Sequence, residues 1–175
     1  TIRDVKTSPA SNNILYALGN NATIYKTVNA SDDPPIFDPI PLPVGASTSI
    51  EGSITVSTLN PNVLYVSANN QVYRSSNAGM TWTNYTASGL PIINFEKIII
   101  DPYSSIESVY LVTTLGIYYK DLTISTWVPV NPQVPVQQQN SSASYAGLIN
   151  GTSLYKGTGS ANSHISFSTW GGGIW

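Results

Sequence analysis

The sequence contains no cysteine and a single histidine, His164. Without cysteine the chain has no disulfide framework, no thiolate nucleophile and no cysteine-ligated zinc site. One histidine also disfavours a histidine-rich metal site or a serine–histidine–acid triad built from this chain alone. We therefore assign no catalytic residue and expect no cofactor.

Charged residues are also scarce, at 9% of the chain, with 7 Lys+Arg against 9 Asp+Glu. Nucleic-acid binding depends on several clustered cations, so this composition disfavours a nucleic-acid partner. No run approaches the roughly 18 apolar residues of a membrane span, and none is expected. The polar residues are mainly Ser, Thr and Asn, a composition that favours an extracellular or secreted protein.

Strand-forming residues dominate this chain of 175 residues. Ile, Val, Thr and the aromatic residues favour a pleated sheet and far outnumber the strong helix formers. Short β-branched runs and alternating patterns recur at residues 54–56, 63–66, 98–100 and 109–112, and no window keeps a helical period. The fold class is predicted to be all-β.

An internal repeat of about 45 residues organises the chain. An aliphatic residue followed by tyrosine occurs at Tyr16, Tyr65, Tyr110 and Tyr155, with spacings of 49, 45 and 45 residues. Such periods are typical of β-propellers, in which each repeat is a four-stranded antiparallel sheet called a blade. We predict blades at residues 1–48, 49–94, 95–139 and 140–175, with the repeated tyrosines packed in the core or between blades.

A turn motif recurs in these repeats. The second repeat contains Ser75, Asn77, Gly79, Thr81 and Trp82, which resemble the Asp-box, S-x-D-x-G-x-T-W, of BNR-repeat propellers, with Asn in place of Asp. Parts of the same pattern recur in the third and fourth repeats, at Trp127, Ser168, Gly172 and Trp175. Glycine supplies a positive φ, the polar side chains bond nearby backbone, and tryptophan covers the gap between sheets.

The resemblance is to the sortilin, sialidase and xyloglucanase-like propellers, a group that shares architecture and not chemistry. A sialidase site of this kind implies three arginines, and the chain has only Arg3 and Arg74. A xyloglucan-cleaving site implies two acids across a cleft, and no pair of acids carries an identifying motif. The first repeat replaces the box with a proline-rich insertion at residues 32–43.

The register of the repeats leaves the last blade, 140–175, without an outer strand. We expect an incomplete ring, which is either a piece of a longer propeller or is completed by further blades or a neighbouring chain, because an open edge strand invites pairing.

The proline-rich insertion carries three carboxylates, Asp32, Asp33 and Asp38. They are candidate calcium ligands or an acid–base pair; the alternative is a stiff surface loop with solvated acids. A second long loop, residues 131–144, is expected to be a flexible connection or a contact loop.

Three aromatic residues outside the repeat are candidate ligand contacts, for example to a sugar: Tyr85, Tyr103 and Trp170. The cations Lys26, Arg74, Lys120 and Lys156 fall near strand ends and are expected to be solvated.

These observations favour a non-catalytic extracellular propeller segment that binds a protein or polysaccharide partner through its loops. Two alternatives stay open. The chain could be a fragment of a propeller glycoside hydrolase, or a structural subunit of an extracellular filament or particle completed by strand addition from a neighbour.

Overall fold

The computed structural model describes residues 1–9, 11–20, 23–43, 45–46, 52–93, 95–113, 116–130, 149–155, 164–169 and 173–174, the last three ranges as backbone only. All regular structure in these residues is β-strand. The all-β prediction is therefore confirmed, and the sheets have the form expected of propeller blades.

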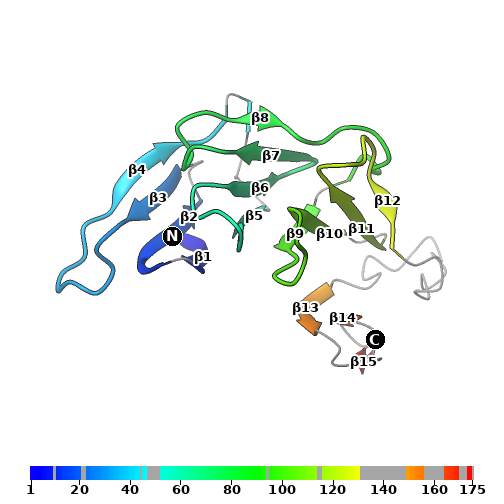
Figure 1. Cartoon of the computed structure of the whole chain (residues 1–175). Helices are drawn as coiled ribbons and strands as arrows, with labels where there is room; N and C mark the ends of the chain where they lie inside the picture. Colours follow the sequence, from blue (N-terminus) through cyan, green and yellow to red (C-terminus); the bar gives the residue numbers. More distant parts are fainter. Residues whose placement is uncertain are drawn as a thin grey trace.

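Three four-stranded antiparallel sheets follow one another along the chain (Figure 1), and we call them blades 1, 2 and 3. Blade 1 contains β1 (Ile2–Ser8), β2 (Ser11–Gly19), β3 (Thr23–Thr27) and β4 (Asp38–Pro41). Blade 2 contains β5 (Gly52–Val56), β6 (Leu64–Ala68), β7 (Gln71–Ser75) and β8 (Thr83–Asn84). Blade 3 contains β9 (Phe95–Ile100), β10 (Ser108–Thr113), β11 (Gly116–Asp121) and β12 (Val128–Pro129).

A further sheet has three described strands, β13 (Ile149–Tyr155), β14 (His164–Thr169) and β15 (Gly173–Ile174), which also pair in chain order. Neighbouring blades meet through their first strands, because β5 contacts both β1 and β9. In Figure 1 the outer strands β4, β8 and β12 fan away from these inner strands.

The strand register repeats from blade to blade. Tyr16, Tyr65 and Tyr110 occupy equivalent positions on the second strands, opposite Lys26, Arg74 and Tyr119 on the third strands. Because side chains alternate across a strand, these tyrosines mark one face of each blade, which we call the forward face. The opposite side of each blade is its rear face.

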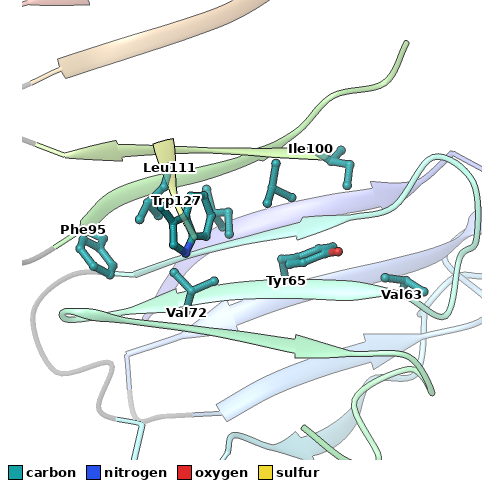
Figure 2. Packing of buried hydrophobic residues seen from close by; sticks show 9 residues of the cluster. Val63, Tyr65, Val72, Phe95, Ile100, Leu111 and Trp127 are labelled. Atoms are coloured by element: carbon teal, nitrogen blue, oxygen red, sulfur yellow. The ribbon is translucent and has the colours of Figure 1, made fainter. Parts of the chain in front are cut away.

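The core lies between blades, where a forward face packs on the next rear face. Between blades 1 and 2 the buried residues are Tyr16, Leu18, Ile24, Ile54, Val56, Leu64 and Val66. Between blades 2 and 3 they are Val63, Tyr65, Val72, Phe95, Ile98, Ile100, Val109, Leu111 and Trp127, most of which Figure 2 labels. Each fully buried aliphatic side chain contributes about 1.5–3 kcal/mol, so these boundaries hold the blades together.

Residues 38–41 of the proline-rich insertion form a strand and not a surface loop. Asp38–Pro41 forms β4, and Ile40 packs against the core between blades 1 and 2. The reason is the position of β4 at the outer edge of its sheet, where proline removes no bond from an inner ladder.

One end of the blades carries the proline-containing turns. In an up-and-down sheet the first–second and third–fourth strand connections lie at the same end. This end therefore holds residue 9 and residues 28–37, 57–63, 76–82, 101–107 and 122–127. We call it the proline-turn end, after Pro9, Pro61 and Pro102.

Candidate functional site

The turn between β7 and β8 is closed by its own side chains. Ser75 Oγ accepts the backbone N–H groups of Asn77 at 3.2 Å and Gly79 at 2.9 Å. Asn77 Oδ1 accepts the Thr81 N–H at 2.9 Å, and Asn77 Nδ2 donates to Thr81 Oγ1 at 2.8 Å. Gly79 has a φ of +86°, a conformation that favours glycine. The polar groups of this turn are thus used locally.

The two tryptophans that precede fourth strands bond backward to the preceding blade. Trp82 Nε1 donates to the Pro41 carbonyl at 3.1 Å, and Trp127 Nε1 donates to the Tyr85 carbonyl at 3.3 Å. Each indole therefore covers an inter-blade gap and also satisfies its one donor. Assignment of these turns as Asp-boxes stays a prediction.

Blade 1 has the beginning of the same turn, which the sequence reasoning missed. Thr27 Oγ1 accepts the Asn29 N–H at 3.2 Å and donates to Asn29 Oδ1 at 2.7 Å, as Ser75 does with Asn77. Asn29 Oδ1 then accepts the Ile36 N–H at 3.1 Å, so this turn encloses a longer loop. The Thr-x-Asn sequence at the end of the third strand could have predicted this turn.

A hydrogen-bonded ion pair joins blades 2 and 3. Arg74 Nη2 lies 2.8 Å from Glu107 Oε2, and Tyr65 Oη donates to the same oxygen at 2.9 Å. Burial, followed by the negative charge of Glu107, raises the pKa of Tyr65 well above its ordinary value. Because Tyr65 is fully buried and Arg74 and Glu107 are partly buried, this cluster stabilises the boundary between the blades.

Tyr85 packs between blades 2 and 3, so it offers no open platform for a sugar ring. Its ring meets Tyr65 and Trp127 edge-on, with centroid distances of 5.4 and 6.1 Å. Its hydroxyl donates to the Asp121 carbonyl at 3.0 Å, and Lys120 Nζ lies 5.0 Å from the ring centroid. This packing explains why Tyr85 is half-buried.

The expectation of solvated cations is wrong for two of the four. Lys120 is buried, which lowers its pKa, and donates to the Ile124 carbonyl. Arg74 is partly buried in the ion pair with Glu107. Lys26 is half-buried opposite Asp38, and Lys156 lies outside the described residues.

The acidic candidates are exposed and are not gathered into one cluster. Asp32, Asp33 and Asp38 are exposed, and Asp32 Oδ2 accepts a hydrogen bond from Asn29 Nδ2 at 2.9 Å. Asp38 lies on β4, apart from the loop that holds the other two. Across the described residues, no three potential metal ligands come together.

Other carboxylates hold the fold together. Asp4 Oδ2 accepts the Ser53 hydroxyl at 3.0 Å and the Ile54 N–H at 3.1 Å, which ties β1 to β5. In blade 3, hydrogen bonds led by the Thr123 hydroxyl lower the pKa of Asp121. Asp4 and Asp121 therefore stabilise the fold through these hydrogen bonds.

The remaining candidates divide into one exposed residue and several that are not described. Tyr103 is exposed at the proline-turn end. Only the backbone of Ser168 is described, as part of β14. Trp170, Gly172, Trp175 and the loop 131–144 lie outside the described residues.

The feature that sequence reasoning missed is a gathering of exposed apolar side chains at the proline-turn end. We call residues 28–36, 57–62, 76–81, 101–106 and 122–126 the loop surface. It exposes Val28, Ile36, Leu59, Met80, Tyr103, Ile106 and Leu122. Its segments contain no Lys or Arg, and the charged residues in them are Asp32, Asp33 and Asp101. The loop surface therefore combines exposed apolar side chains with acidic charge.

None of the described residues forms a helix long and apolar enough to cross a membrane.

No protein-family model and no curated protein matches the sequence. Solved structures do match the fold. The chain resembles a GH74 xyloglucanase from Xanthomonas campestris, at a TM-score of 0.56 and 16% identity, over 75% of this chain and 24% of the xyloglucanase. It also resembles an ancestral GH74 enzyme, at a TM-score of 0.54 and 15% identity, over 74% of this chain and 20% of the enzyme.

A third match is YCF48, solved with a bound D1 peptide. The TM-score is 0.59 at 14% identity, over 99% of this chain and 49% of YCF48. The chain thus spans about a quarter of the xyloglucanase and about half of YCF48. At these identities the comparisons establish the β-propeller fold alone.

Proposed function

We propose that this chain is a non-catalytic propeller segment that acts outside the cell as a binding scaffold for a protein partner, through the loop surface. The observation that carries the proposal is the gathering of exposed apolar side chains on that surface. Scattered apolar residues are ordinary, whereas apolar side chains concentrated on loops at one end of a rigid scaffold are typical of an interaction site.

The charge of the loop surface indicates the partner's chemistry. The charged residues in its segments are acidic, so a partner segment with apolar and basic side chains complements it. The protein-binding proposal is also supported by the YCF48 structure, in which YCF48 is bound to a D1 peptide.

The likeness to GH74 xyloglucanases favours a second candidate function, as part of a glycoside hydrolase. That activity requires two carboxyl groups placed across a cleft. Asp4, Glu107 and Asp121 are instead bound within blades or between them. The engagement of these three acids in structural contacts is the reason that we prefer the binding scaffold.

The test compares three fluorescent synthetic peptides with the same apolar residues, and with lysine, serine or glutamate at the remaining positions. We expect the lysine peptide to bind most tightly, and Met80→Asp to weaken it by about tenfold, as loss of one apolar anchor does. Ile92→Asp is the matched control, because Ile92 is 91% exposed and lies in the β8–β9 connection at the opposite end.

Equal losses in the Met80→Asp and Ile92→Asp variants would contradict the proposed surface. Absence of a preference for the lysine peptide would contradict the proposed partner chemistry. Binding of xyloglucan in place of peptide would overturn the choice of a protein partner, and release of reducing sugar from xyloglucan would establish the hydrolase alternative.

A further inference from the structure

The rear face of blade 1 matches, position by position in the strand register, the rear faces of blades 2 and 3, which are buried between blades. Its central pairs are Val5 with Ala17 and Ala17 with Tyr25. The equivalent positions of blade 2 are Ile54, Val66 and Tyr73, and those of blade 3 are Ile98, Leu111 and Tyr118. All three blades therefore present two small or aliphatic residues and a tyrosine in the same register.

An aromatic residue before the fourth strand completes the pattern. Trp82 and Trp127 directly precede β8 and β12, and Phe37 directly precedes β4. Trp127 packs against blade 2 and is only 2% exposed, whereas Phe37 is 40% exposed. Phe37 thus occupies the position of Trp127. Trp127 is covered by the blade before it, whereas no blade among the described residues covers Phe37.

The exposure of this face sets it apart from its equivalents. Ile54 and Ile98 are fully buried, whereas their equivalent Val5 is 49% exposed; Ala17, the equivalent of Val66 and Leu111, is 5% exposed. The rear face of blade 1 also borders a cavity of about 490 Å³, whose lining includes Ile2, Val5, Leu15, Ala17, Tyr25 and Phe37. A mostly apolar hollow in this place leaves side chains in water that the same repeat buries elsewhere.

We propose that the rear face of blade 1 is an inter-blade interface, and that its occupant is the forward face of a preceding blade of the same repeat. This face continues the series of the two boundaries already described. The occupant's chemistry follows from them: aliphatic side chains against Val5 and Leu15, and a tyrosine whose hydroxyl reaches the turn at Pro9. At the next boundary, Tyr16 Oη donates to the carbonyl of Pro61, which is the equivalent of Pro9.

The test places a blade on this face. Residues 52–94, which include blade 2, are duplicated directly ahead of Thr1, so that a second copy of the forward face of Tyr65 precedes blade 1. Because the chain has no cysteine, Val5→Cys introduces a unique thiol, and its rate of reaction with a maleimide is measured. Val28→Cys is the control, because Val28 is exposed on the β3–β4 loop.

With the blade added, we expect the thiol of the Val5→Cys variant to react at least about tenfold more slowly, because a covered thiol reacts only when its cover opens. The thiol of the Val28→Cys variant should react at an unchanged rate. Leu15→Arg in the extended chain should restore fast labelling, since it places a charge in the new boundary.

Unchanged labelling of the Val5→Cys variant, with circular dichroism showing that the added strands have formed, would overturn the proposal. A second check uses the chain without the added blade. Protection that grows with protein concentration there would identify a second copy as the occupant and would also overturn the assignment to a preceding blade.

Discussion

Tyr65 and Glu107 meet across the boundary between blades 2 and 3, where the tyrosine hydroxyl donates to the carboxylate at 2.9 Å. Glu107 simultaneously holds Arg74 at 2.8 Å, so one carboxylate in the β9–β10 loop secures two side chains of blade 2. Tyr16 makes the corresponding reach from blade 1 to the Pro61 carbonyl. The aliphatic–tyrosine repeat therefore encodes hydrogen bonds between blades as well as packing.

Removal of this carboxylate should destabilise the fold. Glu107→Ala leaves Arg74 and the Tyr65 hydroxyl without their partner, and hydrogen bonds to charged groups contribute about 1.5–3 kcal/mol each. We expect a loss of about 2–3 kcal/mol in the free energy of unfolding, measured by urea titration. Asp33→Ala, at an exposed acid, should change it by less than about 0.5 kcal/mol; equal effects would refute the structural role of Glu107.

Stability should fall at high pH, partly through Tyr16. Burial raises the pKa of Tyr16 to about 12, above the ordinary value of about 10. The folded state therefore holds this proton more tightly than the unfolded state. Its contribution is complete below pH 10 and is lost as the pH rises from about 10 toward 12.

Tyr16→Phe separates this effect from others. At neutral pH the variant should lose about 0.5–1.5 kcal/mol, because the bond to the Pro61 carbonyl is absent. Between pH 10 and 11.5 its urea midpoint should decline less steeply than that of the parent chain. A decline of the same slope would show that Tyr16 does not contribute to the alkaline transition.

Gly79 should tolerate no side chain. Its φ is +86°, and a Cβ there would lie 2.6 Å from Ile40 Cγ2. We expect Gly79→Val to lower the free energy of unfolding by more than about 2 kcal/mol, because strain and overpacking combine. Gly45 has a similar φ of +85°, but no atom of the described residues lies within 4 Å of the same position. Gly45→Val should therefore lower the free energy of unfolding by less. Equal losses in the two variants would show that the contact with Ile40 does not contribute.

Asn77 offers a test of the Asp-box resemblance. Asn77→Asp keeps the oxygen that accepts the Thr81 N–H, whereas Asn77→Ala removes it. We expect Asn77→Ala to lower the melting temperature, with a cost of about 1–2 kcal/mol, and Asn77→Asp to cost less than about 0.5 kcal/mol. A large loss in the Asn77→Asp variant would contradict the resemblance.

The repeat was readable from sequence because its strongest marker carries a structural requirement. Tyr16 and Tyr65 must each be preceded by an aliphatic residue for the opposite face of the same strand, so the dipeptide marks the second strand of a blade. Fourth strands were harder to recognise. They lie at sheet edges, where even Asp38-Pro39-Ile40-Pro41 is accepted as a strand.

The local sequence could not predict which side chains are buried at the boundaries between blades. Lys120 follows a strand pattern and carries a charge, which indicates solvent exposure, yet the Tyr85 ring and the Ile124 carbonyl enclose its ammonium group. The Ile124 carbonyl lies only four residues away in the same blade, but the Tyr85 ring belongs to blade 2 and reaches Lys120 only when the blades pack. The loop surface was missed for the same reason, because its apolar residues are dispersed along the sequence and are gathered by the sheet topology.

The boundaries within this chain have a polarity: tyrosines reach toward the next blade and tryptophans reach back toward the previous one. Such contacts are heterologous, since each joins two different surfaces. A two-fold pairing of identical faces would leave both sets of hydrogen bonds unmade. Growth by this contact can therefore end only in a closed rotational ring or continue as an open helical array, and the rotation per blade decides between them.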